Sequence, residues 1–312
     1  MTTTVHSHIG LEGIVHFKLT NSKTGETRQF EFKNLILDSG LDYFIANVYG
    51  DIITGCILGS SGTTPVVSDT TISNILGSST TRPAYGEGSY NTTVLPYYTS
   101  TYWTYRFIEG VATGNISQVA MTYGSVDTDT NTYSGLFSLA LVKDNNGIPI
   151  TITKLADEVL DVTYTLRIYV PELDTTGVTD ISGVAYNYIV RAAEAALWTV
   201  VYGFPHVYEA IAYTEAIGSL TSKPSGSQAF HTSSTMSAYV AGSFTQDIAI
   251  LWDLNQGNIG GIRSVYLALG RVSYTSTVRF QINYSNAIDD TAIPKDATKR
   301  LTLNYRLTWG RV

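Results

Sequence analysis

The sequence predicts a mainly β protein made of two tandem, related, antiparallel β-sandwich-like domains, each with one short helix. Three observations predict this fold class. Apolar and polar residues alternate through much of the chain, which is typical of half-buried strands. The 312 residues are enough for two cores of about 150 residues each. A segment of the first half recurs in the second half at a nearly constant spacing, which indicates a duplication.

The clearest alternation runs from Leu160 to Val170, where apolar residues occupy the even positions. Polar residues such as Asp161 and Thr163 lie between them. A period of two places the apolar set on one face of a strand and the polar set on the other. This segment therefore predicts an antiparallel strand with one buried face.

Two hairpins are predicted in the first domain. Alternating apolar residues on both sides of the polar, glycine-containing segment 21–26 indicate an N-terminal hairpin. A second turn is predicted at 144–147, because Asn146-Gly147 supplies the positive φ values that a tight turn needs.

One helix and one long loop complete the first domain. Ser39 and Asp42 have capping-box spacing before an apolar face, which predicts a helix over 39–49. The apolar run 52–58 predicts a strand. Residues 78–100 are rich in Ser, Thr, Gly, Tyr and Pro and show little period, so a long surface loop is expected there.

The internal repeat relates two segments by a shift of 143 positions. Residues 114–116 and 257–259 both read Gly-Asn-Ile, and the match is well supported over 105–168 against 248–309. After the hairpin the shift falls to 141, because the second copy has two fewer residues. Apolar positions are kept and the polar positions between them differ, which predicts a shared core and different surface partners.

The predicted boundary lies in 171–181, a segment without period, and gives domains 1–172 and 173–312. The second copy shows no clear N-terminal hairpin, only one strand near 183–190. Its helix is expected over 192–202.

Composition limits the function. Only 14% of the residues are charged, against roughly 25% in ordinary soluble proteins. A net charge of −7 and a pI near 5.2 give no basic face for nucleic acid.

Cys56, the single cysteine, allows neither an intrachain disulfide nor a multi-cysteine zinc site. The chain shows no signal-peptide pattern and no apolar run of about 18 residues, so neither cleaved-signal secretion nor a membrane span is expected.

Two patterns suggest metal binding, and neither supports a prediction of a site. His6 and His8 could hold a metal on one strand edge, but an exposed pair near a terminus is more often unliganded. Residues 127–131 have the opening spacing of a calcium loop. That pattern lacks the required Gly at Thr132 and the bidentate Glu at Ser138, so a polar β-turn is expected.

Catalytic motifs are also missing. The loop 59–62 lacks the Gly-Lys-Ser/Thr ending of a phosphate-binding loop, and no Gly-x-Ser-x-Gly elbow occurs. Asp157 and Glu158 could form a carboxylate pair. Adjacent residues entering a strand point to opposite faces, however, so both are expected on a solvated surface. No catalytic residue, cofactor or metal is predicted.

Aromatic residues crowd the segment from 89 to 105. Trp103, Tyr105 and Phe107 alternate as in a buried strand face. Aromatic faces outside the core can stack on sugars or fill protein interfaces. The candidate partner or glycan contacts are Tyr90, Tyr97, Tyr98 and Tyr102.

Several segments resemble a group of tailed-bacteriophage tail and tail-fibre-associated structural proteins. The resemblance rests on Asn34–Asp42 (NLILDSGLD), on Leu58–Pro65 (LGSSGTTP), and on the strands and turn within 139–164. It covers most of residues 30–170. It implies a virion component at the tail, baseplate or neck that is present in several symmetry-related copies, and it implies no active site.

We therefore expect a non-enzymatic structural protein of a phage virion, made in the host cytoplasm and located at the tail. Its expected partners are other copies of itself, in a ring or a trimer, and other phage tail proteins. A receptor-binding module that recognises host surface carbohydrate through the Tyr-rich loop is the alternative. A carbohydrate-cleaving enzyme is the third hypothesis.

Overall fold

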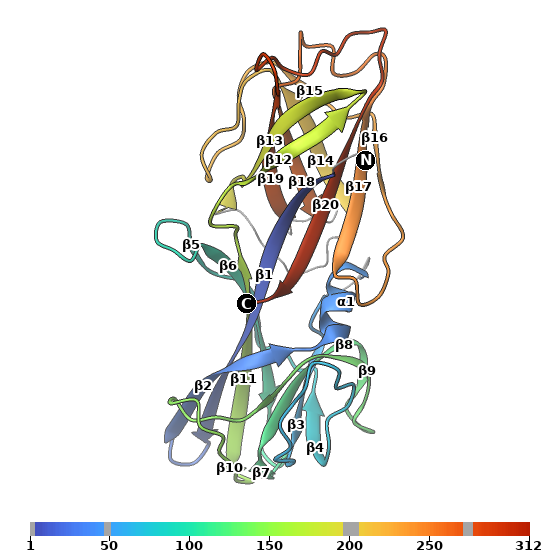
Figure 1. The fold of residues 1–312 in the computed structure, drawn as a ribbon. Coiled ribbons are helices and arrows are strands. Elements are labelled where there is room, and N and C mark those ends of the chain that lie inside the picture. Colours follow the sequence, from blue (N-terminus) through green and yellow to red (C-terminus); the bar gives the residue numbers. More distant parts are fainter. Residues whose placement is uncertain (1–3, 47–50, 196–205, 271–276) are drawn as a thin grey trace.

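The computed structural model describes residues 4–46, 51–195, 206–270 and 277–312. The described chain is mainly β, as predicted, and forms an elongated molecule in which two sandwich-like units lie end to end (Figure 1). One long strand, β1, runs from the upper unit into the lower one (Figure 1).

The first unit contains the following elements in chain order: β1 (Val5–Asn21), β2 (Thr27–Ile36), α1 (Asp38–Ala46), β3 (Gly55–Gly59), β4 (Ile75–Ser79), β5 (Ala84–Asn91), β6 (Tyr98–Phe107), β7 (Gly114–Ile116), β8 (Gln118–Asp127), β9 (Thr132–Leu141), β10 (Ile152–Lys154) and β11 (Glu158–Tyr169). The second unit contains these elements: β12 (Thr175–Ile181), β13 (Val184–Ala192), β14 (His206–Tyr213), β15 (Gln228–Phe230), β16 (Ser233–Met236), β17 (Thr245–Trp252), β18 (Ser264–Gly270), β19 (Thr277–Asn286) and β20 (Leu301–Arg311).

The described strands form two large sheets. The larger has twelve strands, with a main path of β16-β17-β20-β1-β2-β9-β8-β3-β4, and β11, β6 and β5 extend from β1 on a separate branch. The smaller has six strands in the order β12-β13-β19-β18-β14-β15, and β7 pairs with β10 alone. The larger sheet therefore contributes to both units.

Strand β1 changes partners along its length. Residues 10–21 pair antiparallel with β11, whereas residues 5–11 pair in parallel with residues 305–311 of β20. The predicted division after residue 172 assigns all of β1 to the first domain. Its first part nevertheless hydrogen bonds to the last strand of the second unit.

The N-terminal hairpin forms as predicted. Val15 lies opposite Phe32 in the β1–β2 ladder, and the side-chain oxygen of Asn21 accepts hydrogen bonds from the backbone N–H groups of Lys23 and Thr24. The turn at 144–147 also forms.

The predicted helix forms as α1 and begins at Asp38, one residue before the expected start. The last part of its expected range, 47–49, lies outside the described residues. The strand expected over 52–58 is β3, shifted to 55–59.

The loop expected over 78–100 is wrong. That segment contains the end of β4, all of β5 and the beginning of β6. Strand β5 lies at the edge of its sheet and pairs only with β6 among the described strands. Neither face of β5 is fully buried, so its sequence carries glycine and polar residues instead of an alternating apolar set.

The second unit repeats the strand order of the first. Strands β8, β9 and β11 fall on β18, β19 and β20 at the shifts found in the sequence. The pairing corrects the alignment at one strand: Val162 lies opposite Tyr105, and its counterpart Leu303 lies opposite Ile250 instead of Ile248. The sequence alignment is thus two residues out there, because a slip of two preserves the alternation.

The second unit also has its own first hairpin, contrary to the sequence expectation. Strands β12 and β13 pair around Ser182 and Gly183, both with positive φ. Strand β13 then pairs with β19, as β2 pairs with β9. The expected helix over 192–202 begins at a residue that ends β13, and residues 196–205 lie outside the described part of the chain.

The core is continuous between the units. Inward residues of β1, β6, β11, β17 and β20 belong to one cluster of buried side chains. Trp103, Tyr105 and Phe107 are part of it, which confirms that their alternation marks a buried face.

Candidate functional site

The outer face of the large sheet is turned away from the core. It carries the side chains that are best placed to contact a partner molecule. On β11 the odd-numbered residues point outward, and on β20 the even-numbered residues do. This face runs along both units, because β1 is common to both. Two surfaces on it are described in turn.

The four candidate tyrosines do not gather at one place. Tyr98 and Tyr102 lie opposite the outward residues Tyr169 and Thr165 and so share the outer face. Tyr97 is partly buried against the core. Tyr90 lies on β5 with its side chain 60% exposed. Tyr98 and Tyr102 therefore form a common surface, and Tyr90 and Tyr97 lie away from it.

Tyr98 lies in a cluster of aromatic and charged groups that we name the tyrosine surface, consisting of Tyr98, Tyr102, Arg167 and Tyr169. The Arg167 guanidinium lies 4.6 Å from the centre of the Tyr98 ring, and the Tyr169 ring is tilted against it with the two ring centres 6.1 Å apart. Such a cluster suits contact with a flat partner surface or with the face of a sugar.

A buried carboxylate supports this surface from β1. The Tyr169 hydroxyl donates a hydrogen bond to Glu12 at 2.6 Å, and Lys33 and Arg167 form ion pairs with the same carboxylate. Burial alone would raise the pKa of Glu12, but the hydrogen bonds from Lys33 and Tyr169 outweigh it and lower that pKa. The tyrosine surface is thus fixed to an ionised group.

The β5–β6 hairpin projects from the side of the molecule (Figure 1). It exposes large apolar side chains: Tyr90 at 60% and Val94 at 67%. Tyr85 and Leu95 are also exposed, and the Arg82 guanidinium lies over the Tyr85 ring at 4.1 Å. The hairpin is therefore an apolar protrusion next to the tyrosine surface.

The second surface is a hollow of about 290 Å³ on the outer face of the second unit. We name it the polar hollow. Its lining residues come from β16, β17, β20 and the start of the chain: Thr4, Thr235, Met236, Ser237, Asp247, Ile248, Ala249, Asn304 and Tyr305.

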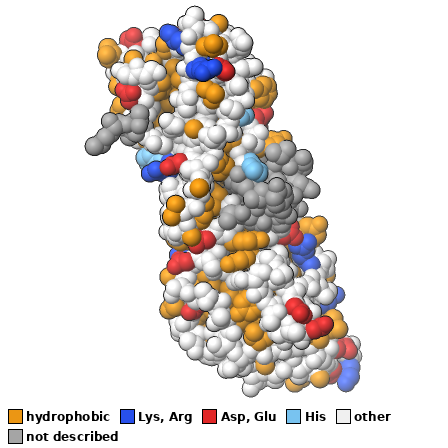
Figure 2. Space-filling view, turned by 90° about the vertical axis from the view of Figure 1, so that its right-hand side faces the viewer, with side chains coloured by type: hydrophobic (Ala, Val, Ile, Leu, Met, Phe, Trp, Pro, Cys, Tyr) orange, Lys and Arg blue, Asp and Glu red, His pale blue; other side chains and the backbone are white. Residues whose placement is uncertain are grey.

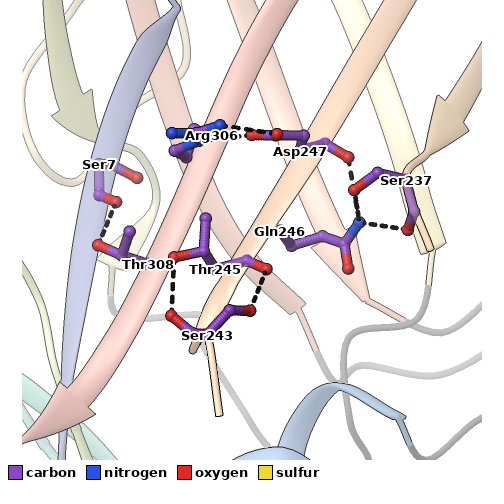
Figure 3. Close-up of polar contacts among 8 residues, drawn as sticks. All are labelled: Ser7, Ser237, Ser243, Thr245, Gln246, Asp247, Arg306 and Thr308. Carbon is purple, nitrogen blue, oxygen red and sulfur yellow. Dashed lines mark hydrogen bonds and ion pairs between the residues drawn. The ribbon is translucent and has the colours of Figure 1, made fainter. Parts of the chain in front are cut away.

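Polar contacts join the strands around the hollow, and Asp247 and Ser237 of its lining take part in them (Figure 3). Arg306 donates through Nε and one terminal nitrogen to the two carboxylate oxygens of Asp247, at 2.6 and 2.8 Å. The hydrogen bond from Arg306 is the main cause that lowers the pKa of Asp247. The buried Gln246 amide donates to the Ser237 carbonyl at 2.8 Å, and the Thr308 hydroxyl donates to the Ser7 carbonyl at 3.2 Å.

The two histidines of the N-terminal strand lie near this surface but bind side chains of the protein. His8 Nδ1 lies 2.9 Å from the Thr308 hydroxyl, and His6 Nδ1 lies 3.2 Å from the Tyr188 hydroxyl. Among the described residues no group of three or more His, Cys, Asp and Glu side chains could coordinate a metal. The predicted turn at 127–131 forms, with Asp127 accepting backbone N–H groups.

The expectation for Glu158 is wrong. Asp157 and Glu158 do point in different directions, but Glu158 is buried and not on a solvated surface. Arg28 donates to both of its carboxylate oxygens, at 2.8 and 3.0 Å. The alternation of β11 starts two residues before the first apolar residue of the pattern, so a charged residue occupies an inward position.

Two buried lysines were not predicted from the sequence. Lys154 and Lys295 occupy corresponding positions of the two copies, at the shift of 141, and both are buried. Lys154 Nζ donates to the Ile108 carbonyl at 3.1 Å, and Lys295 Nζ donates to Asn258 at 2.8 Å. Burial lowers the pKa of both amines. The alignment of the two copies places these two lysines at the same position. This match is the sequence feature that could have indicated a shared buried role.

No helix in the described part of the chain has both the length and the apolar character needed to cross a membrane. Comparison with family models, with curated proteins and with solved structures found no significant match to this chain.

Proposed function

We propose that the protein is a non-enzymatic structural component of the tail of a tailed bacteriophage, and that it assembles with other copies of itself and with other tail proteins. It would be made in the host cytoplasm and reside in the virion, at the baseplate, tail tip, neck or fibre attachment. The resemblance of segments 34–42 and 58–65 to tail structural proteins supports the class of protein. Two features of the structure support the proposal: the composition of its surface and the contacts that connect its two units.

The apolar β5–β6 hairpin is the observation that carries the proposal. Its strand β5 has a single charged residue, Glu87, and it exposes two tyrosines. An edge strand with little charge tends to acquire a partner strand or surface. Covering Tyr90 and Val94 in a neighbouring subunit would bury apolar area and would remove almost no charge from water.

The rest of the surface favours the same use. Charged side chains are sparse on the face shown in Figure 2, where apolar and neutral groups prevail. Neutral hydroxyl and aromatic groups can be buried against a neighbour without the desolvation cost of charges. Broad lateral contacts between copies are therefore energetically accessible.

The joint between the two units supports a structural role. The Tyr239 hydroxyl and the backbone N–H of Gly242 both donate to Asp42 of α1, at 2.6 and 2.8 Å. Arg311 near the end of the chain binds Asp38 at the start of the same helix. These contacts fix one unit against the other, which a load-carrying assembly protein requires.

Two measurements test the proposal. Mass spectrometry of purified particles should find this chain in fixed stoichiometry in the tail, and its absence from particles would refute the proposal. Light scattering should show that the purified chain forms a ring or a trimer. If the purified chain stays a monomer at high concentration, it can assemble only on other tail proteins that act as a template.

A variant pair addresses the hairpin. Tyr90→Lys combined with Val94→Lys should shift the assembly towards monomers, because two positive charges would have to be desolvated at the contact. Ile288→Lys is the matched control, since Ile288 is 94% exposed and follows β19 in the second unit, away from the hairpin of the first. Equal loss of assembly in both would place the contact elsewhere.

The tyrosine surface favours a second candidate function, recognition of host surface carbohydrate. Tyr98 presents a ring already in contact with the Arg167 guanidinium and the Tyr169 ring, so little ordering is needed on binding. Tyr98→Ala and Tyr102→Ala should abolish binding to host cells if this is correct. Tyr90→Ala is the control, because Tyr90 lies off this surface. Absence of cell binding by the intact protein would remove this candidate.

A further inference from the structure

The polar hollow of the second unit has the size of a site for one sugar ring. Its volume is about 290 Å³, and pockets that hold drug-sized ligands begin at about 300 Å³. Ala249 contributes only a methyl group between Thr235 and Asn304, its neighbours across the sheet. The small side chain leaves room above the strand.

The groups around this space can both donate and accept hydrogen bonds. Asp247 uses one lone pair of each oxygen for Arg306 and keeps others, while Arg306 keeps N–H groups beyond the two that it uses. The carboxamide of Asn304 makes no side-chain hydrogen bond within the described part of the chain and offers a donor and an acceptor. Neighbouring hydroxyl groups of a sugar, each a donor and an acceptor, match this arrangement.

The charge of the hollow favours a neutral ligand. The Asp247 carboxylate and the Arg306 guanidinium are paired side by side, so their charges cancel. An anionic ligand would be repelled by the Asp247 carboxylate, and a cationic ligand would be repelled by the Arg306 guanidinium. The methyl group of Ala249 adds apolar lining, which suits the C–H groups of a ring.

The hollow is organised before any ligand binds. It lies on paired strands, and the amide of Gln246 is buried and ties the end of β16 to β17 through Ser237 (Figure 3). The bidentate pair holds two long side chains in one geometry. Binding would therefore cost little conformational entropy.

The first unit shows what the same sheet looks like without a hollow. Its counterparts of Ala249 and Asn304 are Thr104 and Thr163, whose hydroxyl oxygens lie 2.9 Å apart and bond to each other. Tyr102 stands where the second unit has Asp247. The duplicated sheet has thus acquired, in one copy only, a small residue flanked by free polar groups.

We propose that the polar hollow binds one neutral hexopyranose unit of a glycan through Asp247 and Asn304 of its lining, with Arg306 holding the Asp247 carboxylate in place. This inference goes beyond the proposed structural function and uses a surface different from the tyrosine surface. The site adds a carbohydrate-binding activity to an assembly protein.

Saturation-transfer NMR on the full chain tests the inference, with D-glucose, D-galactose and N-acetyl-D-glucosamine as separate probes. At least one of them should receive magnetisation. Ala249→Thr introduces the residue of the first unit into the hollow and should weaken binding by roughly tenfold or more, which corresponds to about 1.4 kcal/mol. Asn304→Thr should act in the same direction. Both changes reproduce residues that the first unit carries at these positions.

Thr104→Ala is the matched control, because it makes the reverse change in the first unit and should leave sugar binding unchanged. Equal thermal midpoints would confirm that each variant folds. Three results would overturn the inference: no signal from any of the three sugars, unchanged binding in Ala249→Thr, or binding that is lost in Tyr98→Ala instead. The last result would assign the sugar to the tyrosine surface. None of these results would contradict the proposed structural function, which mass spectrometry of purified particles tests independently.

Discussion

The indole N–H of Trp309, on the last strand, donates a hydrogen bond to the backbone carbonyl of Leu41, 2.9 Å away in α1. The two residues are 268 positions apart in the sequence. The bond is buried, and it joins the second unit to the only helix of the described chain. Together with the contacts of Asp42 it holds the second unit against α1.

We predict that Trp309→Phe destabilises the protein by about 0.5–1.5 kcal/mol beyond its loss of volume, because the buried hydrogen bond to the Leu41 carbonyl would be lost. Trp103→Phe is the control: Trp103 is equally buried, yet within the described residues its indole N–H has no hydrogen-bond partner. Urea unfolding of both variants measures the difference. Equal losses would show that the bond to Leu41 contributes nothing.

The parallel pairing of β1 with β20 gives a second prediction. Ile9 is fully buried in the part of β1 that pairs with β20, so Ile9→Ala should cost about 2–5 kcal/mol. Amide hydrogen exchange should quicken in residues 305–311. Lys18→Ala changes an exposed residue of the same strand outside this pairing and should stay within about 0.5 kcal/mol. If exchange quickened only in the first unit, the pairing would be wrong.

Glu12 predicts a dependence of stability on pH. Its pKa is lower in the folded protein than its ordinary value, so the folded state binds fewer protons than the unfolded state in that range. The stabilisation is complete above the ordinary pKa of about 4.3 and is lost as the pH falls through the lowered value. Glu12→Gln should therefore reduce the free energy of unfolding at pH 7, and its difference from the parent should shrink in acid.

Urea titrations at neutral and acidic pH measure this effect. Glu31→Gln removes one negative charge at an exposed position of β2 and controls for net charge. A difference between Glu12→Gln and the parent that stays constant with pH would contradict the role of the ionised carboxylate.

Gly40 predicts an exception to helix propensity. Alanine normally stabilises a helix relative to glycine by about 1 kcal/mol. A Cβ at Gly40 would, however, collide with the carbonyl oxygen of Phe137 in β9. Gly40→Ala should therefore lower the thermal midpoint, since backbone atoms of β9 would have to move.

Gly62→Ala is the matched substitution, because nothing lies near the added methyl group there and φ is not positive. It should leave stability unchanged or raise it by about 0.4–1 kcal/mol. A stabilising Gly40→Ala would mean that α1 and β9 are further apart than described.

The sequence by itself determined the strands and their buried faces. The alternation in β11 and β20, the hairpin turn at 21–26 and the helix near 39 depend on neighbouring residues, so local patterns reveal them. The duplication was also visible, because inward positions keep their apolar character. Strand β5 was missed because an edge strand with no fully buried face has no apolar period.

Only the tertiary structure decided which strands are neighbours. The change of partner along β1 and the two-residue correction between β6 and β17 leave every alternation intact, so no local pattern could reveal them. The outer-face grouping of Tyr98 with Tyr169, and the free space over Ala249, depend on pairing between distant segments. The physical reason is that a period of two fixes the face of a side chain, whereas its neighbours across the sheet depend on register.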